Sequence, residues 1–560
     1  MPLPTAALIA LAVLLCLPLA YWLYNKIQRR RLYRRLRAQW GQPSALRRPD
    51  QDVLSDIADY HQAALQAEPD PQAVDDTTWR DLDMDELFRG LDCSQSIVGS
   101  ELLYDILRRQ GAGEEEVAAR QRLATAFLQD EALRLQVQGN LHAIGNSAFH
   151  NASRYLHHPD YQMPAWPWLY RLLAALPTLC LLLGLLHPYF LFAALGFFGI
   201  NMFVYYRSQE TWKKEFFAIK HIASVLSVAQ RLCRLQHAAL RDEQAQMRPL
   251  LKQLRSIRRW LPLFGIEQVG DAAFILEYIK VFFMLDMISL VQIIGALGRQ
   301  GAEVREIYRL VGSVDACLSI AQLRARSNAL CTPAFHQALR VEAEGIRHPL
   351  IAGAVTNDLS WQRNLLISGS NASGKSTFIK AVAINCILAQ TIGLCFAESF
   401  SLCHARVMSS MAISDNVLAG ESYFIAEIRS LKRILDAAGV EPPVLCFIDE
   451  ILRGTNTIER IAASSAVLQS LSNRRLLCMT ATHDIELTRL LQDSWDNAHF
   501  AERVDDSGVS FDYLLHPGPT QTRNAILLLK QMGYDEGIVR RAMDSVAAFE
   551  NTGIWPSPGS

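Results

Sequence analysis

The stretch that most constrains how this chain can fold runs from Leu366 to Thr377 and reads LISGSNASGKST. An apolar strand pattern leads into a glycine-rich turn and then a helix, which is the G-x-x-x-x-G-K-S arrangement of a nucleotide phosphate loop. Glycines at Gly369 and Gly374 let backbone N–H groups curl around phosphates, and the helix dipole favours the negative charge there. Such a turn also arises by chance, but the flanking elements and a second motif downstream favour the phosphate loop.

The loop predicts roles for two side chains. Lys375 is expected to reach the β- and γ-phosphates of ATP, and the Ser376 hydroxyl to ligate Mg²⁺. The predicted nucleotide-binding residues are Gly369, Ser370, Asn371, Ala372, Ser373, Gly374, Lys375, Ser376 and Thr377.

A second motif, VLCFIDE, spans Val444 to Glu450. A buried parallel strand that ends in two carboxylates delivers them to the carboxyl edge of the sheet, where the phosphate loop also lies. We expect Asp449 to hold the Mg²⁺ and Glu450 to orient or deprotonate the attacking water. Taken alone, the run would be a strand with a solvated tip, and the phosphate loop about 75 residues earlier favours the catalytic role.

A third apolar strand pattern, Leu476 to Thr482, ends at His483. A lone histidine at a strand end is usually a satisfied polar residue. The two earlier motifs favour a catalytic role for His483, as a sensor of the γ-phosphate.

Length and composition set broad bounds. The 560 residues suffice for three or four domains with apolar cores, and the formal net charge of -1 does not indicate nucleic-acid binding. Eleven cysteines lack paired metal spacing, and several, such as Cys446 and Cys478, sit in apolar patterns. They are typical of reduced core residues in a cytosolic compartment and predict neither zinc nor disulfides.

The N-terminal residues 1–25 carry no charged side chain and are nearly continuous aliphatic sequence from Ala6 to Tyr24. This length predicts a transmembrane anchor; a cleaved signal peptide would need a basic start and a shorter apolar core. The positive charges follow the span, at Lys26, Arg29, Arg30, Arg31, Arg34, Arg35 and Arg37. By the positive-inside rule they place the rest of the chain in the cytoplasm, while nucleic-acid contact is the alternative role for these charges.

Residues 26–80 are predicted to be a basic juxtamembrane segment and a linker with a short helix, and residues 81–163 to be the first part of a helical core. A second apolar block runs from Leu172 to Tyr206 without a formal charge, and His187-Pro188 breaks it near its middle. A single crossing would put the phosphate loop outside the cell, so residues 164–206 predict a transmembrane hairpin. A buried hydrophobic hairpin in a soluble domain is the alternative.

Amphipathic helices are expected over residues 207–340, the second part of the helical core. Within them, Ala273 to Leu297 is apolar but contains Glu277, Lys280 and Asp286, which favours a buried core helix over a further span. A nucleotide-binding domain is expected over residues 341–548, and residues 549–560 form a Ser/Pro/Gly tail predicted to be disordered.

Five ordered motifs resemble those of the MutS family, the ABC-type ATPases of DNA mismatch repair. They are Gly345-Ile-Arg-His-Pro (family G-R-H-P), Ser370–Thr377 (P-N-M-G-G-K-S-T), Gly420–Ile428 (the signature segment), Asp449–Thr457 (D-E-I-G-R-G-T-S-T) and Thr480–His483 (A-T-H). The resemblance implies that Ser422 reaches the γ-phosphate bound by a partner copy, so that two such domains sandwich two ATPs. From the sequence alone Ser422 would be an ordinary helix N-cap. The segment from Leu91 to Gly99 resembles a motif of the family's helical core more weakly.

Departures from the family limit what the resemblance implies. The mismatch-reading domain has no counterpart before residue 81, and the predicted membrane hairpin occupies the part of the core from which DNA-clamping helices would emerge. Leu452 replaces a family glycine and Ser370 a proline, and neither change removes a catalytic group.

The predicted fold class is therefore mixed: a helical core or lever with transmembrane helices, followed by an α/β P-loop ATPase of the ABC type.

The predicted function is that of a dimeric, multi-pass ATPase of the cell (inner) membrane, with its ATPase domain in the cytoplasm, that uses ATP and Mg²⁺. Binding of mismatched, distorted or branched DNA in a repair role follows from the resemblance alone. The alternative is a membrane scaffold or signalling ATPase whose lever acts on a protein partner. An ABC transporter would need an L-S-G-G-Q-type signature and several more spans.

One cluster of basic residues leaves two roles open, because it could contact phosphates or form a solvated helix face. Its members are Lys213, Lys214, Lys220, Arg255, Arg258 and Arg259.

Overall fold

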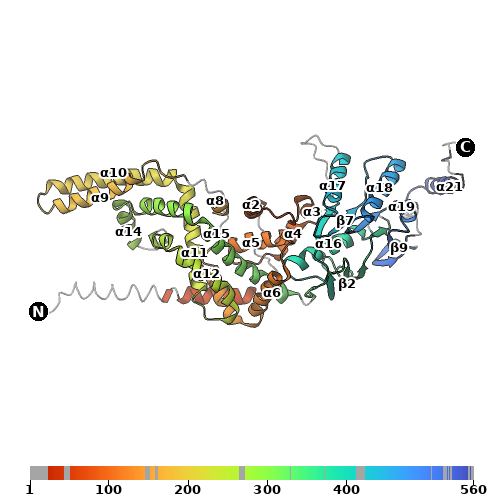
Figure 1. Ribbon diagram of the computed structural model, residues 1–560, viewed down its shortest axis with the longest axis horizontal. Helices are drawn as coiled ribbons and strands as arrows, with labels where there is room; N and C mark the ends of the chain where they lie inside the picture. The colour runs from red at the N-terminus through yellow and green to blue at the C-terminus, as the bar shows by residue number, and fades with distance from the viewer. Residues whose placement is uncertain are drawn as a thin grey trace. The chain divides into compact units, whose positions relative to one another are not determined.

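The structure is a computed structural model, and it describes residues 23–24, 26–42, 51–145, 152–157, 162–263, 271–327, 329–370, 373–411, 423–505, 508–520, 526, 529, 532–552 and 555–556. Two compact units divide the chain. Unit 1 comprises Met1–Asp70, Arg89–Ile106 and Ala119–Ser327, and unit 2 comprises Pro71–Phe88, Leu107–Ala118 and Asn328–Ser560. The described part of unit 1 is helical and the described strands lie in unit 2, which confirms the predicted order of a helical region followed by an α/β region (Figure 1).

A helix over residues 26–39 begins the described part of unit 1. The helices that follow in this unit are α2 (Gln51–Ala67), α7 (Glu131–Leu141), α8 (Ala152–His157), α9 (Pro167–Leu183), α10 (Tyr189–Thr211), α11 (Lys213–Leu232), α12 (Arg241–Gln253), α13 (Arg255–Arg258), α14 (Asp271–Phe282) and α15 (Leu285–Arg326). Three more, α4 (Met84–Leu91), α5 (Ile97–Arg108) and α6 (Glu114–Gln129), contribute residues to both units. The segment predicted to be mostly linker thus contains α2, a helix of 17 residues.

The long helix α15 organises the core of unit 1 through Asp315, which is fully buried. The Asp315 carboxylate accepts hydrogen bonds from the backbone N–H groups of Gln95 and Ser96, both at 2.8 Å, and from the Ser96 hydroxyl at 2.6 Å. A Cβ on Gly99 would lie 2.4 Å from Asp315 Oδ2, so α5 reaches this distance from α15 only because residue 99 is glycine. Burial raises the pKa of Asp315 to about 7, although these hydrogen bonds oppose the rise. The contacts of Gln95, Ser96 and Gly99 with Asp315 therefore give the Leu91–Gly99 motif a role in packing α5 against α15.

Helices α9 and α10 form an antiparallel hairpin that extends away from the other helices of unit 1 (Figure 1). Most of its large apolar side chains are exposed, including Leu185 at 85% and Phe203 at 75%. Among the described residues α10 is long and apolar enough to cross a membrane, and α9 is apolar but shorter. The first predicted span, residues 1–25, lies outside the described residues apart from Leu23 and Tyr24.

The segment that was predicted to be one buried helix, Ala273 to Leu297, is divided in two. Helix α14 ends at Phe282, and Met284 takes a left-handed conformation (φ 49°) before α15 begins. Asn201 of α10 donates hydrogen bonds to the carbonyl oxygens of Leu173 in α9 and Phe282 in α14, at 2.9 and 3.0 Å. These contacts tie α14 to the base of the hairpin.

A six-stranded sheet with the order β10-β9-β4-β8-β7-β6 forms the centre of unit 2. Its strands are β4 (Leu365–Ser368), β6 (Arg406–Ser410), β7 (Val444–Asp449), β8 (Leu476–Thr482), β9 (Asp496–Asp505) and β10 (Gly508–Pro517), and only the β9–β10 pair is antiparallel. A smaller sheet has the order β1-β5-β2-β3, from β1 (Ala334–Phe335), β5 (Ser399–Leu402), β2 (Val341–Ile346) and β3 (Asn357–Trp361).

The main sheet is buried on both faces, as the continuous apolar strand patterns predict. Alternate residues of β7, such as Cys446 and Ile448, pack in one core with α17 (Tyr423–Ala437), α18 (Thr457–Ser472) and α19 (Ile485–Leu490). Helix α16 (Lys375–Thr391) contacts β6, β7 and β8. The helix α21 (Glu536–Thr552) begins after the strands and extends into the predicted tail.

The edge strand β6 is covered by side chains from a distant part of the chain. The backbone N–H groups of Val407, Ser409 and Met411 donate to Gln110, Thr78 and Asp81, respectively. Thr78 and Asp81 belong to α3 (Asp76–Asp81). An uncovered edge would leave these donors free to pair with another chain, so residues 71–88 and 107–118 complete the sheet.

Candidate functional site

The turn between β4 and α16 has the backbone that its glycines predict. Gly369 and Gly374 take positive φ angles of 145° and 106°, and Gly374 is the N-cap of α16. A Cβ on Gly369 would lie 3.0 Å from the carbonyl oxygen of Phe500, and one on Gly374 3.1 Å from the Tyr513 ring. Both positions therefore favour glycine. Asn371 and Ala372 lie outside the described residues.

Lys375, the first residue of α16, turns its ammonium group back over this turn. Its Nζ donates to the carbonyl oxygens of Gly369 at 2.8 Å and Ser370 at 2.6 Å, and it lies 3.5 Å from His483 Nε2. Burial lowers the pKa of Lys375 to about 8, although the carboxylates of Glu450 and Asp449 oppose the change. A buried ammonium group beside the N-terminus of a helix is suited to binding phosphate.

The strand register brings the three predicted motifs to one edge of the sheet. Ser368 of β4 is paired with Thr482 of β8, and Asp449 of β7 is paired with Ala481 of the same strand. Because these strands are parallel and end together, the residues that follow them meet.

Glu450 lies at the centre of this edge. Its Oε1 is 2.7 Å from His483 Nε2, and its Oε2 is 2.5 Å from Arg453 Nε. Burial would raise the pKa of Glu450, but the hydrogen bond and charge of His483, with the charges of Arg453 and Lys375, lower it overall. The carboxylate is therefore ionised at neutral pH and held from two sides, as a group that orients or deprotonates a water must be.

Asp449 offers an oxygen for a metal ion. Its Oδ1 is buried and accepts no hydrogen bond from any residue that the structure describes, and the same holds for Ser373 Oγ in the adjoining turn. The described residues contain no group of three His, Cys, Asp or Glu side chains able to hold a metal. These donors fit Mg²⁺, which commonly takes one or two protein oxygens and completes its shell with water and phosphate. Asp449 and Ser376 would supply the protein oxygens.

Beside these residues lies a hollow of about 510 Å³, and its lining includes Ser373, Gly374, Lys375, Ser376, Thr377 and Glu450. The sequence analysis did not identify a further part of the lining, the wall formed by His348, Ile351, Val355, Phe500 and Tyr513. Apolar and aromatic side chains beside a phosphate-binding turn are suited to the base and sugar of a nucleotide. The wall comes from distant segments, and the Gly345-Ile-Arg-His-Pro motif was the available signal for His348.

His348 is neutral at physiological pH. Burial and the charge of Lys380 lower its pKa to about 4, although Asp83 opposes the change. Asn357 positions the wall by donating to the Tyr513 carbonyl oxygen at 3.0 Å and accepting from the Leu515 N–H at 2.7 Å.

Glu427 of α17 is a further residue that the sequence analysis missed. It is 3% exposed, and its carboxylate accepts a hydrogen bond from the backbone N–H of Leu452, in the turn that follows Glu450. Burial raises the pKa of Glu427, while hydrogen bonds from the N–H groups of Leu452 and Arg453 oppose the rise. Leu452 takes a positive φ of 56°, a backbone conformation that favours the glycine of the motif that this segment resembles.

The structure thus brings together Lys375, Asp449, Glu450 and His483, and the catalytic and ligand roles of these residues stay predictions. Ser370 lies at the same turn, where its hydroxyl donates to Glu502. Ser422, predicted to act on a partner's nucleotide, lies outside the described residues.

Comparisons with known proteins agree on the C-terminal region. A family model described as MutS domain V matches residues 365–550. The DNA mismatch repair protein MutS of Thermus caldophilus is 29% identical over 256 residues, covering 45% of this chain and 31% of that protein. The protein of the same name from Nitratidesulfovibrio vulgaris (strain DP4) is 32% identical over 258 residues, covering 43% and 28%. DNA mismatch repair protein MutS 2 of Haloarcula marismortui is 33% identical over 195 residues, covering 34% and 20%. The chain therefore spans less than a third of the length of these relatives.

Proposed function

Because the C-terminal region of the chain belongs to the MutS family, we propose that unit 2 binds ATP with Mg²⁺ and hydrolyses it. The observation that carries the proposal is the meeting of Lys375, Asp449, Glu450 and His483 beside a hollow of about 510 Å³. Lys375 and the N-terminus of α16 bind the phosphates, and the wall that includes Tyr513 receives the base and sugar. Mg²⁺ held by Asp449 and Ser376 supplies charge neutralisation at the β- and γ-phosphates.

Within this site Glu450 orients the attacking water and accepts its proton. His483 and Arg453 each contact one of the two carboxylate oxygens, which fixes the direction in which Glu450 presents its charge. His483 also lies next to Lys375, so it is placed to respond to the phosphate that Lys375 binds.

The test of hydrolysis compares Glu450→Gln with Glu459→Gln in the full-length protein. Glu459 is an exposed carboxylate in the first turn of α18 and serves as the matched control. We expect Glu450→Gln to lower turnover by about 100-fold or more while ATP binding persists, because the base is lost and the phosphate contacts are kept. A Glu450→Gln protein with the wild-type rate would refute the site.

A homodimer is the second element of the proposal, and the resemblance supports it. Ser422 of one copy would complete the nucleotide site of the other. Sedimentation of the Glu450→Gln protein should then show dimers that form with ATP and dissociate without it. A monomer under both conditions would exclude the trans site.

DNA is the proposed effector, because relatives of the C-terminal half of the chain are named as DNA mismatch repair proteins. We expect mismatched or branched duplexes to stimulate ATP turnover, and the stimulation to fall steeply as salt rises, since phosphate contacts release counterions. Turnover that ignores homoduplex, mismatched and branched DNA alike would exclude this role.

Membrane attachment is proposed for the α9–α10 hairpin, with unit 2 in the cytoplasm. At 1.5 Å per residue, α9 and α10 measure about 25 and 35 Å, against a hydrocarbon layer of about 30 Å. The exposed apolar side chains of the hairpin support this placement and also favour a second candidate function, an ATPase whose helical region acts on a protein within the membrane. Extraction with alkaline carbonate tests the placement: an inserted hairpin stays with the membrane, and a protein released into the supernatant would refute it.

A further inference from the structure

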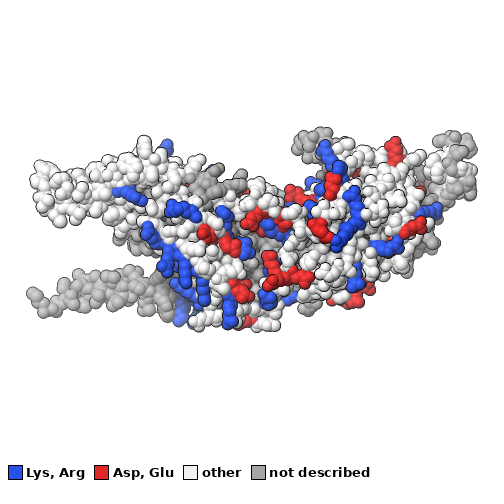
Figure 2. Space-filling model, in the orientation of Figure 1, with Lys and Arg blue, Asp and Glu red and all other residues white. Residues whose placement is uncertain are grey.

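A basic hollow lies in unit 1, and the ATPase site does not involve it. Its volume is about 780 Å³, and five cationic side chains line it: Lys220, Arg231, Arg255, Arg258 and Arg259. No carboxylate is among the described residues that line it. Figure 2 shows Lys and Arg side chains gathered over the part of unit 1 where α11 and α12 lie.

Helix α11 builds one wall of this hollow with a regular stripe. Lys220, Ser224, Ser227 and Arg231 follow one another at intervals of four, three and four residues, which places them on one face of the helix. The Ser224 hydroxyl donates to the Lys220 carbonyl oxygen at 3.2 Å, so the stripe presents the Ser227 hydroxyl and two cations as donors. Hydroxyls and cations together are the donors that a phosphate group accepts from.

Helix α13 and the residue after it provide the facing cations. Arg258 is half-buried; its Nη1 donates to the Leu251 carbonyl oxygen at 3.0 Å, while its buried Nε has no acceptor among the residues described. The Arg259 guanidinium lies 5.2 Å from the Trp260 ring. These contacts hold the two guanidinium groups beside the hollow without neutralising them.

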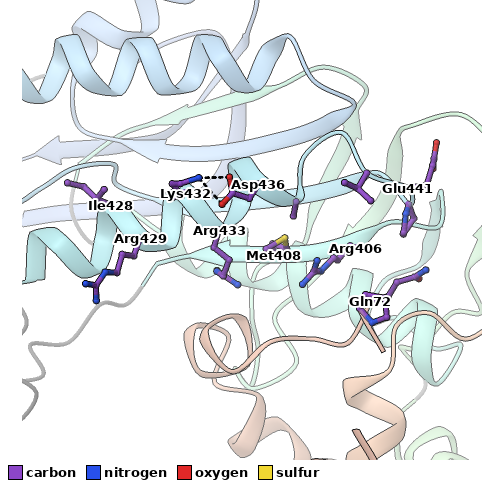
Figure 3. A pocket seen from close by; sticks show the side chains of 13 residues that line it. Gln72, Arg406, Met408, Ile428, Arg429, Lys432, Arg433, Asp436 and Glu441 are labelled. Atoms are coloured by element: carbon purple, nitrogen blue, oxygen red, sulfur yellow. Dashed lines mark hydrogen bonds and ion pairs between the residues drawn. The ribbon is translucent and has the colours of Figure 1, made fainter. Parts of the chain in front are cut away.

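A second basic hollow, in unit 2, provides a contrast (Figure 3). There Lys432 Nζ bonds to both oxygens of Asp436, at 2.6 and 2.9 Å, and Arg433 pairs with Asp75. Carboxylates of the protein itself therefore compensate Lys432 and Arg433. No carboxylate is among the described residues that line the hollow beside α11, and the charges of Arg231, Arg255, Arg258 and Arg259 are therefore available to an outside anion.

The position of the first hollow in the chain points to the source of that anion. Helix α11 follows α10 after a single residue, Trp212, so the stripe begins nine residues after the hairpin helix ends. Lys213 and Lys214 stand directly at this junction. A hairpin that crosses the membrane would therefore hold the mouth of the hollow near the headgroups of the cytoplasmic leaflet.

We propose that this hollow binds the phosphate of an anionic lipid headgroup. The inference rests on the proposed membrane placement of the α9–α10 hairpin. Basic pockets beside membrane helices on the cytoplasmic side suit such headgroups, and anionic lipids concentrate in that leaflet. A hollow of this size takes one headgroup, whereas duplex DNA presents a continuous row of phosphates that calls for an extended basic surface.

The test uses the full-length protein in nanodiscs of phosphatidylcholine and phosphatidylglycerol in equal amounts, with retained lipid counted by native mass spectrometry. We expect wild-type protein to retain phosphatidylglycerol preferentially, and Arg255→Gln/Arg259→Gln to lower that preference roughly tenfold, because each cation near the surface contributes to headgroup binding. The matched control, Arg429→Gln/Lys432→Gln, neutralises two cations of the unit 2 hollow and should keep the wild-type preference.

Further arms separate the possible sources of phosphate. Inorganic phosphate and glycerol 3-phosphate are added as soluble competitors, and a fluorescent duplex is offered to the same three proteins. Displacement of the lipid by inorganic phosphate at low concentration would overturn a headgroup site in favour of a free-phosphate site. Duplex binding lost in Arg255→Gln/Arg259→Gln, with lipid retention unchanged, would overturn it in favour of DNA.

Two controls keep this proposal distinct from the proposed function. A wild-type protein that carbonate extracts from membranes refutes the hairpin placement, and the lipid site fails with it. A protein that stays in the membrane and hydrolyses ATP, yet retains both lipids equally, refutes the lipid site alone. Unchanged ATP turnover in Arg255→Gln/Arg259→Gln would show that a lost lipid preference does not come from misfolding.

Discussion

The protonation of Lys375 gives the sharpest test of the nucleotide site. Burial lowers its pKa from 10.5 to about 8, so the ammonium form is destabilised while the side chain faces protein groups alone. With this pKa about one tenth of the side chains are neutral at pH 7, about half at pH 8 and about nine tenths at pH 9. Bound phosphates would restore the charged form. ATP binding should therefore take up close to 0.1, 0.5 and 0.9 protons at these three pH values, to within about one pH unit.

Calorimetry with a non-hydrolysable ATP analogue measures this uptake directly. Binding enthalpies are compared in buffers with different ionisation enthalpies, and the slope gives the number of protons. Because the Glu450 carboxylate raises the Lys375 pKa, Glu450→Gln should increase the uptake at pH 8. Lys375→Arg should abolish it, since arginine stays charged. An uptake that does not rise between pH 7 and pH 9 would refute the argument that Lys375 is the buried phosphate ligand.

The same shift in the Lys375 pKa determines how this residue changes the stability of the folded protein with pH. Because the folded pKa of Lys375 lies below the unfolded one, the unfolded chain binds more protons between about pH 8 and 10.5. The contribution of Lys375 therefore disfavours folding below pH 8 and is relieved as the pH rises through that window.

Three further predictions concern packing, and thermal unfolding of the full-length protein measures the first two. Leu452→Gly and Leu452→Ala both lose a side chain that is 5% exposed, but only glycine relieves the positive φ at this position. The glycine variant should therefore be the more stable of the two by about 1 kcal/mol. A more stable alanine variant would show that the backbone at residue 452 is not strained. Gly99→Ala should destabilise by about 1 to 3 kcal/mol because its Cβ meets Asp315, whereas Gly90→Ala, with open space around the Cβ, should be neutral or stabilising. Glu427→Ala leaves the Leu452 N–H unpaired and should lower ATP turnover about tenfold at similar ATP affinity, with rescue by Gln through its amide oxygen; equal turnover in Ala and wild type would exclude a positioning role.

Local sequence patterns predicted the elements of the sheet that bear the site. The strand expected over residues 444–450 is β7 at Val444–Asp449, and the one expected over 476–482 is β8 with the same bounds. These runs are apolar and short, and each ends at the polar residue that enters the site. Because parallel strands share one carboxyl edge, these patterns indicated that Lys375, Glu450 and His483 lie at the same edge of the sheet.

Contacts between distant segments had no such signal. Thr78 and Ser409 are 331 residues apart, yet the hydroxyl of one accepts from the backbone of the other at the edge of the sheet. Nothing in the composition of residues 71–88 distinguishes a segment that covers a strand from a helix of the core. The wall formed by His348 and Tyr513 was missed for the same reason, since ordinary residues become a binding surface only through tertiary packing.

The break before α15 shows a different limit. Residues 273–297 are mostly apolar, and the pattern contains no glycine or proline before Gly295. The left-handed Met284 is fixed instead by tertiary contacts around it. Asp286 lies 3.5 Å from Lys280 and accepts a hydrogen bond from Tyr205 at 2.7 Å, so an ion pair and a hydrogen bond across three helices hold the turn.

The contacts of α17 indicate how two functional segments of unit 2 are coupled. Glu427 binds the backbone of the turn after Glu450, and a Cβ on Gly454 would lie 2.9 Å from Phe424 Cβ, so helix and turn meet without room for sliding. The segment that holds Ser422 directly precedes α17 in the chain. If Glu450 is displaced when a phosphate binds or leaves, either the N-terminal end of α17 moves with it or the hydrogen bond from Leu452 to Glu427 breaks. Glu427 is 3% exposed, so breaking this bond would leave a buried group unpaired at a cost of about 1 to 3 kcal/mol. Movement of α17 is therefore favoured. By this route the state of one nucleotide site would reach the residue proposed to act on the other.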